Sequence, residues 1–76
     1  MKKNGFEKMK MVDINMVKKN SPRVVRIFAE KSDPFFSTVE VSNSRTGKIQ
    51  WSYILSSDVP QRIGILEREG FIITSK

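Results

Sequence analysis

Apolar positions along this chain follow two periods, and the two periods predict different elements. Between residues 36 and 55, valines and aromatic residues alternate with polar ones, which is typical of a strand with one covered face. In the same region Trp51, Leu55 and Val59 recur at every fourth residue, as they would on one side of a helix. Periodicity alone therefore leaves both a helix and a β-hairpin open for residues 35–56.

The N-terminal half is similarly ambiguous. Residues 6–20 show a loose helical pattern, in which Phe6, Met9 and Met16 fall near one face. Apolar residues within 22–30 fit helical spacing and strand spacing equally well. We expect a helix for the first segment and leave the second open.

The C-terminal part of the chain gives the clearest prediction. A helix that begins near residue 58 places Pro60 in its opening turn, where the missing N–H does no harm. Ile63 and Leu66 then share one apolar side, and Gly70 is placed to end the helix in a left-handed conformation. The following "FIITSK" is rich in β-branched residues and predicts a short strand.

Composition narrows the class of protein. The chain has 76 residues, which predicts one small domain over residues 6–76 after a flexible basic start at residues 1–5. It contains no Cys and no His, which removes the commonest metal ligands and the commonest general base. We therefore expect no enzymatic activity, no metal site and no cofactor. Without a long apolar run or a secretory signal, we expect a cytoplasmic protein with no membrane partner.

Charge is distributed unevenly along the chain. The net charge is +6, and residues 1–31 carry nine Lys and Arg against three acids, whereas residues 32–76 carry five of each. Lysines near phosphates release condensed counterions, so this asymmetry favours a nucleic-acid partner. Solubility is the competing explanation, because small proteins often carry a surplus of one sign.

One segment resembles a known family. Residues 62–72, "RIGILEREGFI", resemble the end of the recognition helix and the first wing strand of winged helix-turn-helix regulators. Residues 22–47 are similar to the first two helices of that family. The resemblance implies a small single-domain α+β fold, winged-helix-like with a truncated wing. It also implies a DNA-binding transcriptional regulator that uses phosphate contacts and a recognition helix on double-stranded DNA, and we expect a homodimer because one such domain has a small footprint.

The expected contact residues come from two sources. The basic N-terminal part supplies lysines for phosphates, and the resemblance supplies residues of the turn and of the recognition helix. The predicted nucleic-acid-binding residues are Lys2, Lys3, Lys18, Lys19, Arg45, Lys48, Gln50, Ser52, Tyr53, Gln61, Arg62 and Arg68.

A second architecture follows if the segments with alternating apolar and polar residues are assigned as strands. It is an α-βββ-α fold with a three-stranded antiparallel sheet, with helices at 6–19 and 58–69 and strands at 23–30, 36–42 and 48–55. Such a protein would bind RNA, or would be a small inhibitor or adaptor that binds a protein. We expect Trp51 in the core, whereas Tyr53 could lie in the core or stack on a base, and both alternatives stay open. The conformation of residues 38–46 separates the two architectures.

Overall fold

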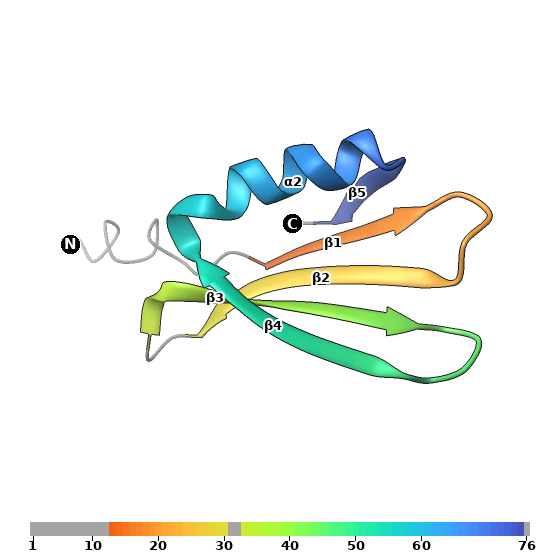
Figure 1. The fold of residues 1–76 in the computed structure, drawn as a ribbon, viewed down its shortest axis with the longest axis horizontal. Coiled ribbons are helices and arrows are strands. Elements are labelled where there is room, and N and C mark those ends of the chain that lie inside the picture. The colour runs from red at the N-terminus through yellow and green to blue at the C-terminus, as the bar shows by residue number, and fades with distance from the viewer. Residues whose placement is uncertain (1–12, 31–32, 76) are drawn as a thin grey trace.

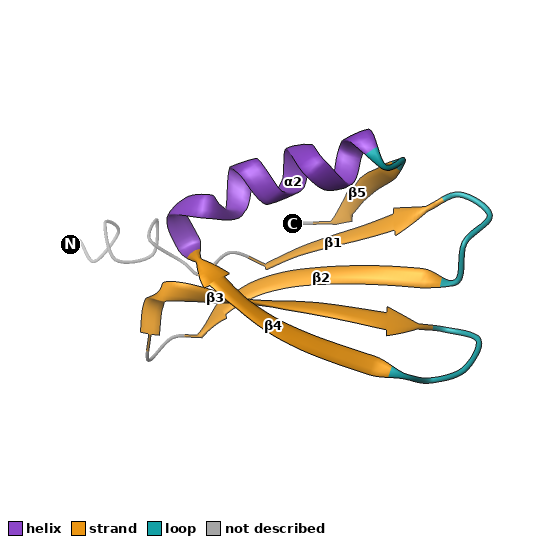
Figure 2. Ribbon diagram, viewed as in Figure 1, coloured by secondary structure: helices purple, strands orange, loops and turns teal. Residues whose placement is uncertain are grey.

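The computed structural model describes residues 13–30 and 33–75, and these form one antiparallel sheet and one helix (Figures 1 and 2). The strand order across the sheet is β4-β3-β2-β1-β5. In chain order the elements are β1 (Asp13–Lys18), β2 (Arg23–Glu30), β3 (Asp33–Asn43), β4 (Ile49–Leu55), a 3₁₀ turn (Ser56–Asp58), α2 (Val59–Arg68) and β5 (Phe71–Ser75).

The path from β4 to β5 decides which face of the sheet is covered. These two strands are the opposite edges of the sheet, so the chain must cross its whole width between them. Helix α2 makes that crossing and packs on one face, which we call the inner face (Figure 1). Within the described residues nothing packs on the other side of the sheet, which we call the outer face.

The hydrophobic core lies between α2 and the inner face. It draws on alternate residues of three strands, together with the first residue of the helix and the first residue of β5. Full burial of one large aliphatic side chain stabilises a fold by about 1.5–3 kcal/mol. The core residues are Ile14, Met16, Val25, Ile27, Val39, Val59 and Phe71.

The winged-helix fold predicted from the sequence is wrong. Residues 38–46, expected in the second helix, form the end of β3 and its turn, and residues 23–30, expected in the first helix, form β2. The physical reason is visible in the register, where Val25 pairs with Val41 and Ile27 with Val39. These pairs put β-branched side chains next to one another on one face, where they pack better than on a helix.

The alternative fold class is wrong as well. Its three strands lie close to β2, β3 and β4, but the sheet has five strands. Residues 13–18, expected in a helix, form β1, because Ile14 and Met16 alternate with Asp13 and Asn15 and complete the inner face. Phe6 and Met9, the other residues assigned to that helix, lie outside the described residues.

The C-terminal predictions are confirmed. Pro60 lies in the first turn of α2, and Ile63 and Leu66 pack against the core. The chain leaves the helix through Gly70, whose φ of 105° is the left-handed conformation that glycine adopts without strain. Phe71 then opens β5 and is buried.

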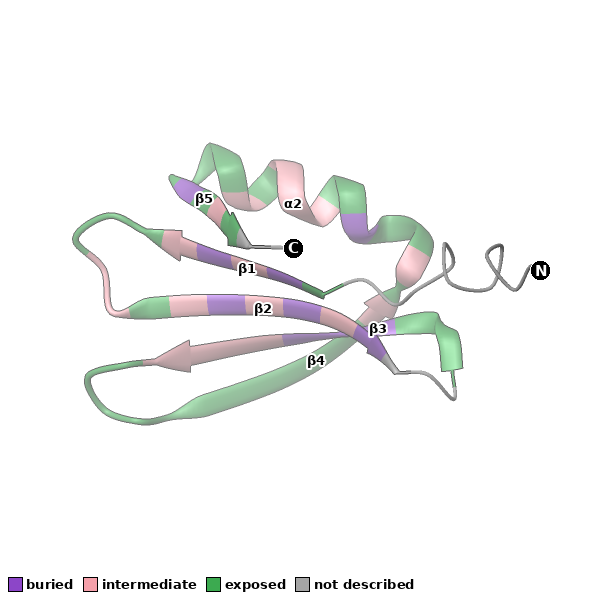
Figure 3. Ribbon diagram, turned by 180° about the vertical axis from the view of Figure 1, so that it is seen from behind, coloured by how far each residue is buried: buried purple, intermediate pink, exposed green. Residues whose placement is uncertain are grey.

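Strand β4 differs from β1, β2 and β3 in the face that carries most of its apolar side chains. Ile49, Trp51, Tyr53 and Leu55 alternate with other residues as predicted, but they occupy the outer face, because Trp51 pairs with Glu40 and Ser52 with the buried Val39. Ile54 is the apolar residue of β4 that packs against the core. Trp51 is 59% exposed and Tyr53 is 73% exposed, so the expectation that Trp51 lies in the core is wrong. Figure 3 shows β4 exposed along most of its length, in contrast to the alternating buried and half-buried bands of β2.

Candidate nucleic-acid interface

The turn between β1 and β2 is held by local hydrogen bonds. Asn20 has a φ of 61°, a left-handed conformation that asparagine tolerates better than most residues. The backbone N–H of Ser21 donates to the carbonyl of Lys18 at 3.2 Å. The hydroxyl of Ser21 accepts the N–H of Arg23, also at 3.2 Å. This turn therefore presents Lys18, Lys19 and Arg23 from a defined backbone.

The turn between β3 and β4 is built around Asn43. Its side-chain oxygen accepts the backbone N–H groups of Arg45 and Thr46 at 2.9 and 3.0 Å, and its backbone carbonyl accepts that of Gly47 at 2.7 Å. Asparagine and glycine are typical of such turns, because the amide closes the loop and glycine supplies the positive φ, here 79°. The N–H of Asn43 donates to the carbonyl of Lys48 at 2.9 Å, which fixes where β4 begins.

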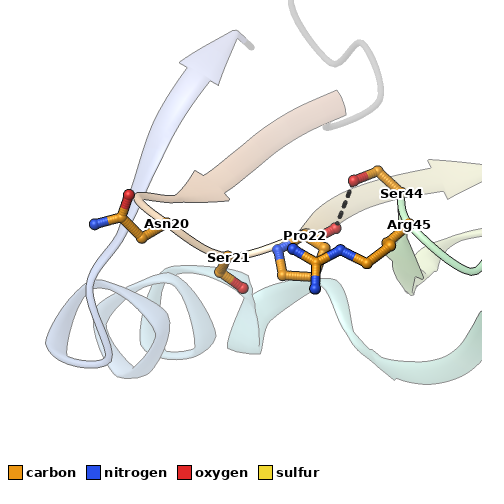
Figure 4. Close-up of a pocket in the computed structure, with 5 residues that line it drawn as sticks. All are labelled: Asn20, Ser21, Pro22, Ser44 and Arg45. Atoms are coloured by element: carbon orange, nitrogen blue, oxygen red, sulfur yellow. Dashed lines mark hydrogen bonds between the residues drawn. The ribbon is translucent and has the colours of Figure 1, made fainter.

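The two turns are bonded to each other. Both the backbone N–H and the hydroxyl of Ser44 donate to the carbonyl of Pro22, at 2.8 and 3.0 Å. An open hollow between the turns is lined by both of them, as Figure 4 shows. Five basic residues therefore share one end of the sheet. We call this set the basic end: Lys18, Lys19, Arg23, Arg45 and Lys48.

The cationic side chains of the basic end are accessible for binding. All five are exposed, and within the described part of the chain none of them forms an ion pair. Lys18 makes one further contact, with its ammonium 6.0 Å from the centre of the Phe71 ring. Glu67 and Glu69, at the C-terminal end of α2, lie at the same end of the sheet beside β5, and no described residue forms an ion pair with them.

The ion pair found among the described residues lies on the outer face. Arg26 donates to both carboxylate oxygens of Asp13, at 3.0 and 3.1 Å. These hydrogen bonds, reinforced by the positive charge and opposed by slight burial, hold the pKa of Asp13 below its ordinary value. The Arg26 guanidinium also lies over the Phe28 ring, 4.6 Å from its centre. This pair is not part of the basic end.

The structure brings together only part of the predicted contact set. Lys18, Lys19, Arg45 and Lys48 are in the basic end. Gln50 and Ser52 point to the inner side of β4, Tyr53 to its outer side, and Gln61, Arg62 and Arg68 belong to α2. Lys2 and Lys3 lie outside the described residues. The recognition-helix role assigned to the middle of the chain is wrong, since those residues form β3 and β4.

Arg23 belongs to the basic end and was not among the predicted contacts. It opens β2 and pairs with Asn43, so it stands between the two turns. The signal that could have found it was the basic surplus of residues 1–31, which includes Arg23. Placing it beside Arg45 required the register of β2 on β3.

Other kinds of site are not found in the described residues. They contain no group of three or more acidic side chains arranged to hold a metal ion, and no helix there is long and apolar enough to cross a membrane. Comparison with known proteins adds no further assignment. No protein-family model matches the chain, and no curated protein or solved structure matches it significantly.

Proposed function

We propose that this protein binds nucleic acid by placing the basic end against backbone phosphates. The observation that carries the proposal is the convergence of five cations on two hairpin turns that hydrogen bond to each other, none of the five having an ion pair within residues 13–30 and 33–75. Cations of this kind supply most of the affinity in binding that does not depend on sequence. The contact is with the backbone, so it positions the protein without reading bases.

Pre-organisation of the turns supports the proposal. Each cation follows or precedes a residue whose backbone is fixed by the hydrogen bonds around Ser21, Asn43 and Ser44. Binding therefore requires ordering of the side chains alone, which lowers its entropic cost. Asp13, Asp33 and Asp58 lie at the other end of the strands, whereas Glu67 and Glu69 lie at the same end as the turns, beside β5.

The test compares two double variants of equal charge. Arg45→Gln with Lys48→Gln removes two cations from the basic end, and Arg26→Gln with Arg62→Gln removes two from elsewhere, one on the outer face and one on α2. Fluorescence anisotropy with a labelled random duplex measures affinity for both, and a single strand of the same length serves as the second probe. If two phosphate contacts are lost, counterion release predicts a fall of roughly 50-fold at 0.1 M salt for the first variant.

The variant Arg26→Gln with Arg62→Gln is the matched control. It has the same net charge, so it experiences the same change in long-range attraction and should lose much less affinity. Equal losses in the two variants would show that net charge alone drives binding, and the basic end would then have no special role. Absence of binding by the unaltered protein at low salt would overturn the proposal.

A further inference from the structure

Strand β4 is an edge of the sheet without the features that usually protect an edge. Its seven residues, Ile49–Leu55 (IQWSYIL), include no charged residue, no proline and no glycine. Exposed edges in soluble proteins are normally short, bulged or charged, because unpaired backbone groups attract other strands. The opposite edge, β5, has five residues and pairs with β1 through a register shift between Asn15 and Met16.

The outer face of β4 is unusually apolar for exposed surface. Four side chains form a continuous row, which we call the outer row: Ile49, Trp51, Tyr53 and Leu55, exposed to 45%, 59%, 73% and 47%. The two aromatic rings alone expose roughly 300 Å². A patch of that size on a small protein typically marks an interaction site.

The charges near this row do not suit a polyanion. The indole N–H of Trp51 donates to the carboxylate of Glu40 at 3.1 Å, so an acid stands beside the largest ring. Arg26, the cation on the same face, is already paired with Asp13. The row therefore fits an apolar, hydrogen-bonding strand better than it fits a phosphate backbone.

The geometry points to a second copy of this chain as the occupant: we propose that two β4 strands pair antiparallel about a two-fold axis at Ser52, joining two sheets into one. Ser52 is the middle of the strand, so this register pairs all seven residues. Trp51 then faces the partner's Tyr53, and Ile49 faces the partner's Leu55. The outer row thus continues across both copies, as an isologous interface requires.

The backbone of β4 is oriented for this pairing. In an antiparallel ladder, successive residues point their N–H and C=O groups alternately to one neighbour and to the other. Lys48 bonds toward β3, through the N–H of Asn43 at 2.9 Å. By alternation, Trp51 and Tyr53 direct their backbone groups to the free edge, where a partner strand can bond them.

The proposed interface is small, so we expect a weak dimer. Stable complexes bury about 800 Å² on each partner. Edge pairing buries the free backbone of β4 and the flanks of the outer row, with Phe36, 48% exposed and paired with Leu55, beside them. The match of aromatic to aromatic and of aliphatic to aliphatic side chains across the axis, rather than the area, favours a second copy. Because the contact is apolar, salt should leave it unchanged or strengthen it, whereas salt weakens phosphate binding.

Sedimentation equilibrium of the full chain, without nucleic acid, tests the proposal. We expect a concentration-dependent dimer. Tyr53→Lys introduces a charge into the edge and should raise the dissociation constant by about 30-fold or more. Ile72→Lys is the control, because Ile72 is 61% exposed on the outer face of the other edge strand. This control should dimerise normally.

Cross-linking tests the register independently, because the chain contains no cysteine. Ser52→Cys places one thiol on the proposed axis, in a non-hydrogen-bonded pair whose Cα atoms are about 4.5 Å apart, within disulfide range. Oxidation should therefore yield a disulfide-linked dimer. Gln50→Cys is the control, since its two copies would stand four residues out of register, about 13 Å apart.

Three results would overturn the proposal. They are a monomer at all accessible concentrations, equal dissociation by both lysine variants, and equal cross-linking at both cysteine positions. A monomer whose Trp51 fluorescence is quenched by a single-stranded oligonucleotide would assign the outer row to bases instead. The dimer is measured without nucleic acid, so its failure leaves the phosphate proposal standing, and the converse also holds.

Discussion

Replacing Ile27 with alanine and, separately, Ile72 with alanine makes the same chemical change on opposite faces of the sheet. Ile27 is fully buried on the inner face, at the centre of the core under α2. Ile72 lies on the outer face of β5 and is 61% exposed. β2 is a central strand and β5 an edge strand, so the loss of β-propensity does not cancel, and the comparison depends on burial and on the cavity that is left.

The expected magnitudes differ by a factor of about three. Ile27→Ala leaves a cavity that close packing cannot fill, and such changes cost about 2–5 kcal/mol. About two-fifths of Ile72 is buried, so Ile72→Ala loses about 1 kcal/mol of a full-burial value of 1.5–3, with no cavity to add. The total stability of a 76-residue chain is roughly 4–11 kcal/mol, so the first loss threatens the fold.

Urea denaturation followed by Trp51 fluorescence measures both losses, at a protein concentration low enough to avoid association. With a slope of about 1 kcal/mol/M, the midpoint should fall by about 3 M for Ile27→Ala and about 1 M for Ile72→Ala. Ile27→Val, which should cost about 1 kcal/mol, keeps the test valid if the alanine variant does not fold. Equal losses at the two positions would refute the assignment of an inner and an outer face.

Three further predictions concern local structure. Gly64→Ala should raise the free energy of unfolding by about 0.5–1 kcal/mol, because an added Cβ there meets nothing within 4 Å. Gly70→Ala should lower it by about 1–2 kcal/mol, because φ at Gly70 is 105°. Thermal melts should therefore show a raised melting temperature for the first variant and a lowered one for the second. The pKa of Asp13 is lowered in the folded protein, so its pair with Arg26 stabilises the fold at pH values above the ordinary carboxyl pKa. That stabilisation is lost as the pH falls through the lowered pKa. Asp13→Asn should therefore cost about 0.5 kcal/mol of stability at neutral pH and nothing in acid. Asn43→Ala removes the acceptor for two backbone N–H groups and should cost about 1 kcal/mol, measured by urea titration.

The parts of the fold that follow from local chemistry could be predicted from the sequence. Pro60 and Gly70 fix the start and the end of α2, because each restricts or permits backbone angles in its own residue. Asn43 and Gly47 suit a hairpin turn for the same reason, although the resemblance assigned this segment to a helix. None of these features depends on distant packing.

The rest of the fold depends on how strands that are distant in the sequence pair with one another. The spacing of residues 22–30 and 36–55 fits a helix and a strand equally, and only mutual packing of the inner-face valines favours the sheet. The exposure of Trp51 could not be predicted for a related reason. The alternation in β4 is clear from the sequence, but the face of the sheet on which its apolar side chains lie depends on the register with β3. A shift of one residue would have buried the same side chains.

The candidate site, like the fold, could be predicted only in part from the sequence. Lys18, Lys19, Arg45 and Lys48 could be identified from charge and resemblance, but they are separated by up to 30 positions along the chain. The hydrogen bonds between the two turns bring them to one end of the sheet. In the proposed dimer the two-fold axis at Ser52 would set the two basic ends at opposite ends of a continuous sheet.

The central claim is that the basic end meets nucleic-acid phosphates, and the salt dependence of binding tests it most directly. The affinity of the unaltered protein for a random duplex should be measured by anisotropy between about 0.05 and 0.3 M salt. Five cations predict a linear plot of log affinity against log salt, with a slope between about −2 and −4.5. The double variant Arg45→Gln with Lys48→Gln should make that slope shallower by about 1.8. A slope near zero, or one that this variant leaves unchanged, would contradict the account.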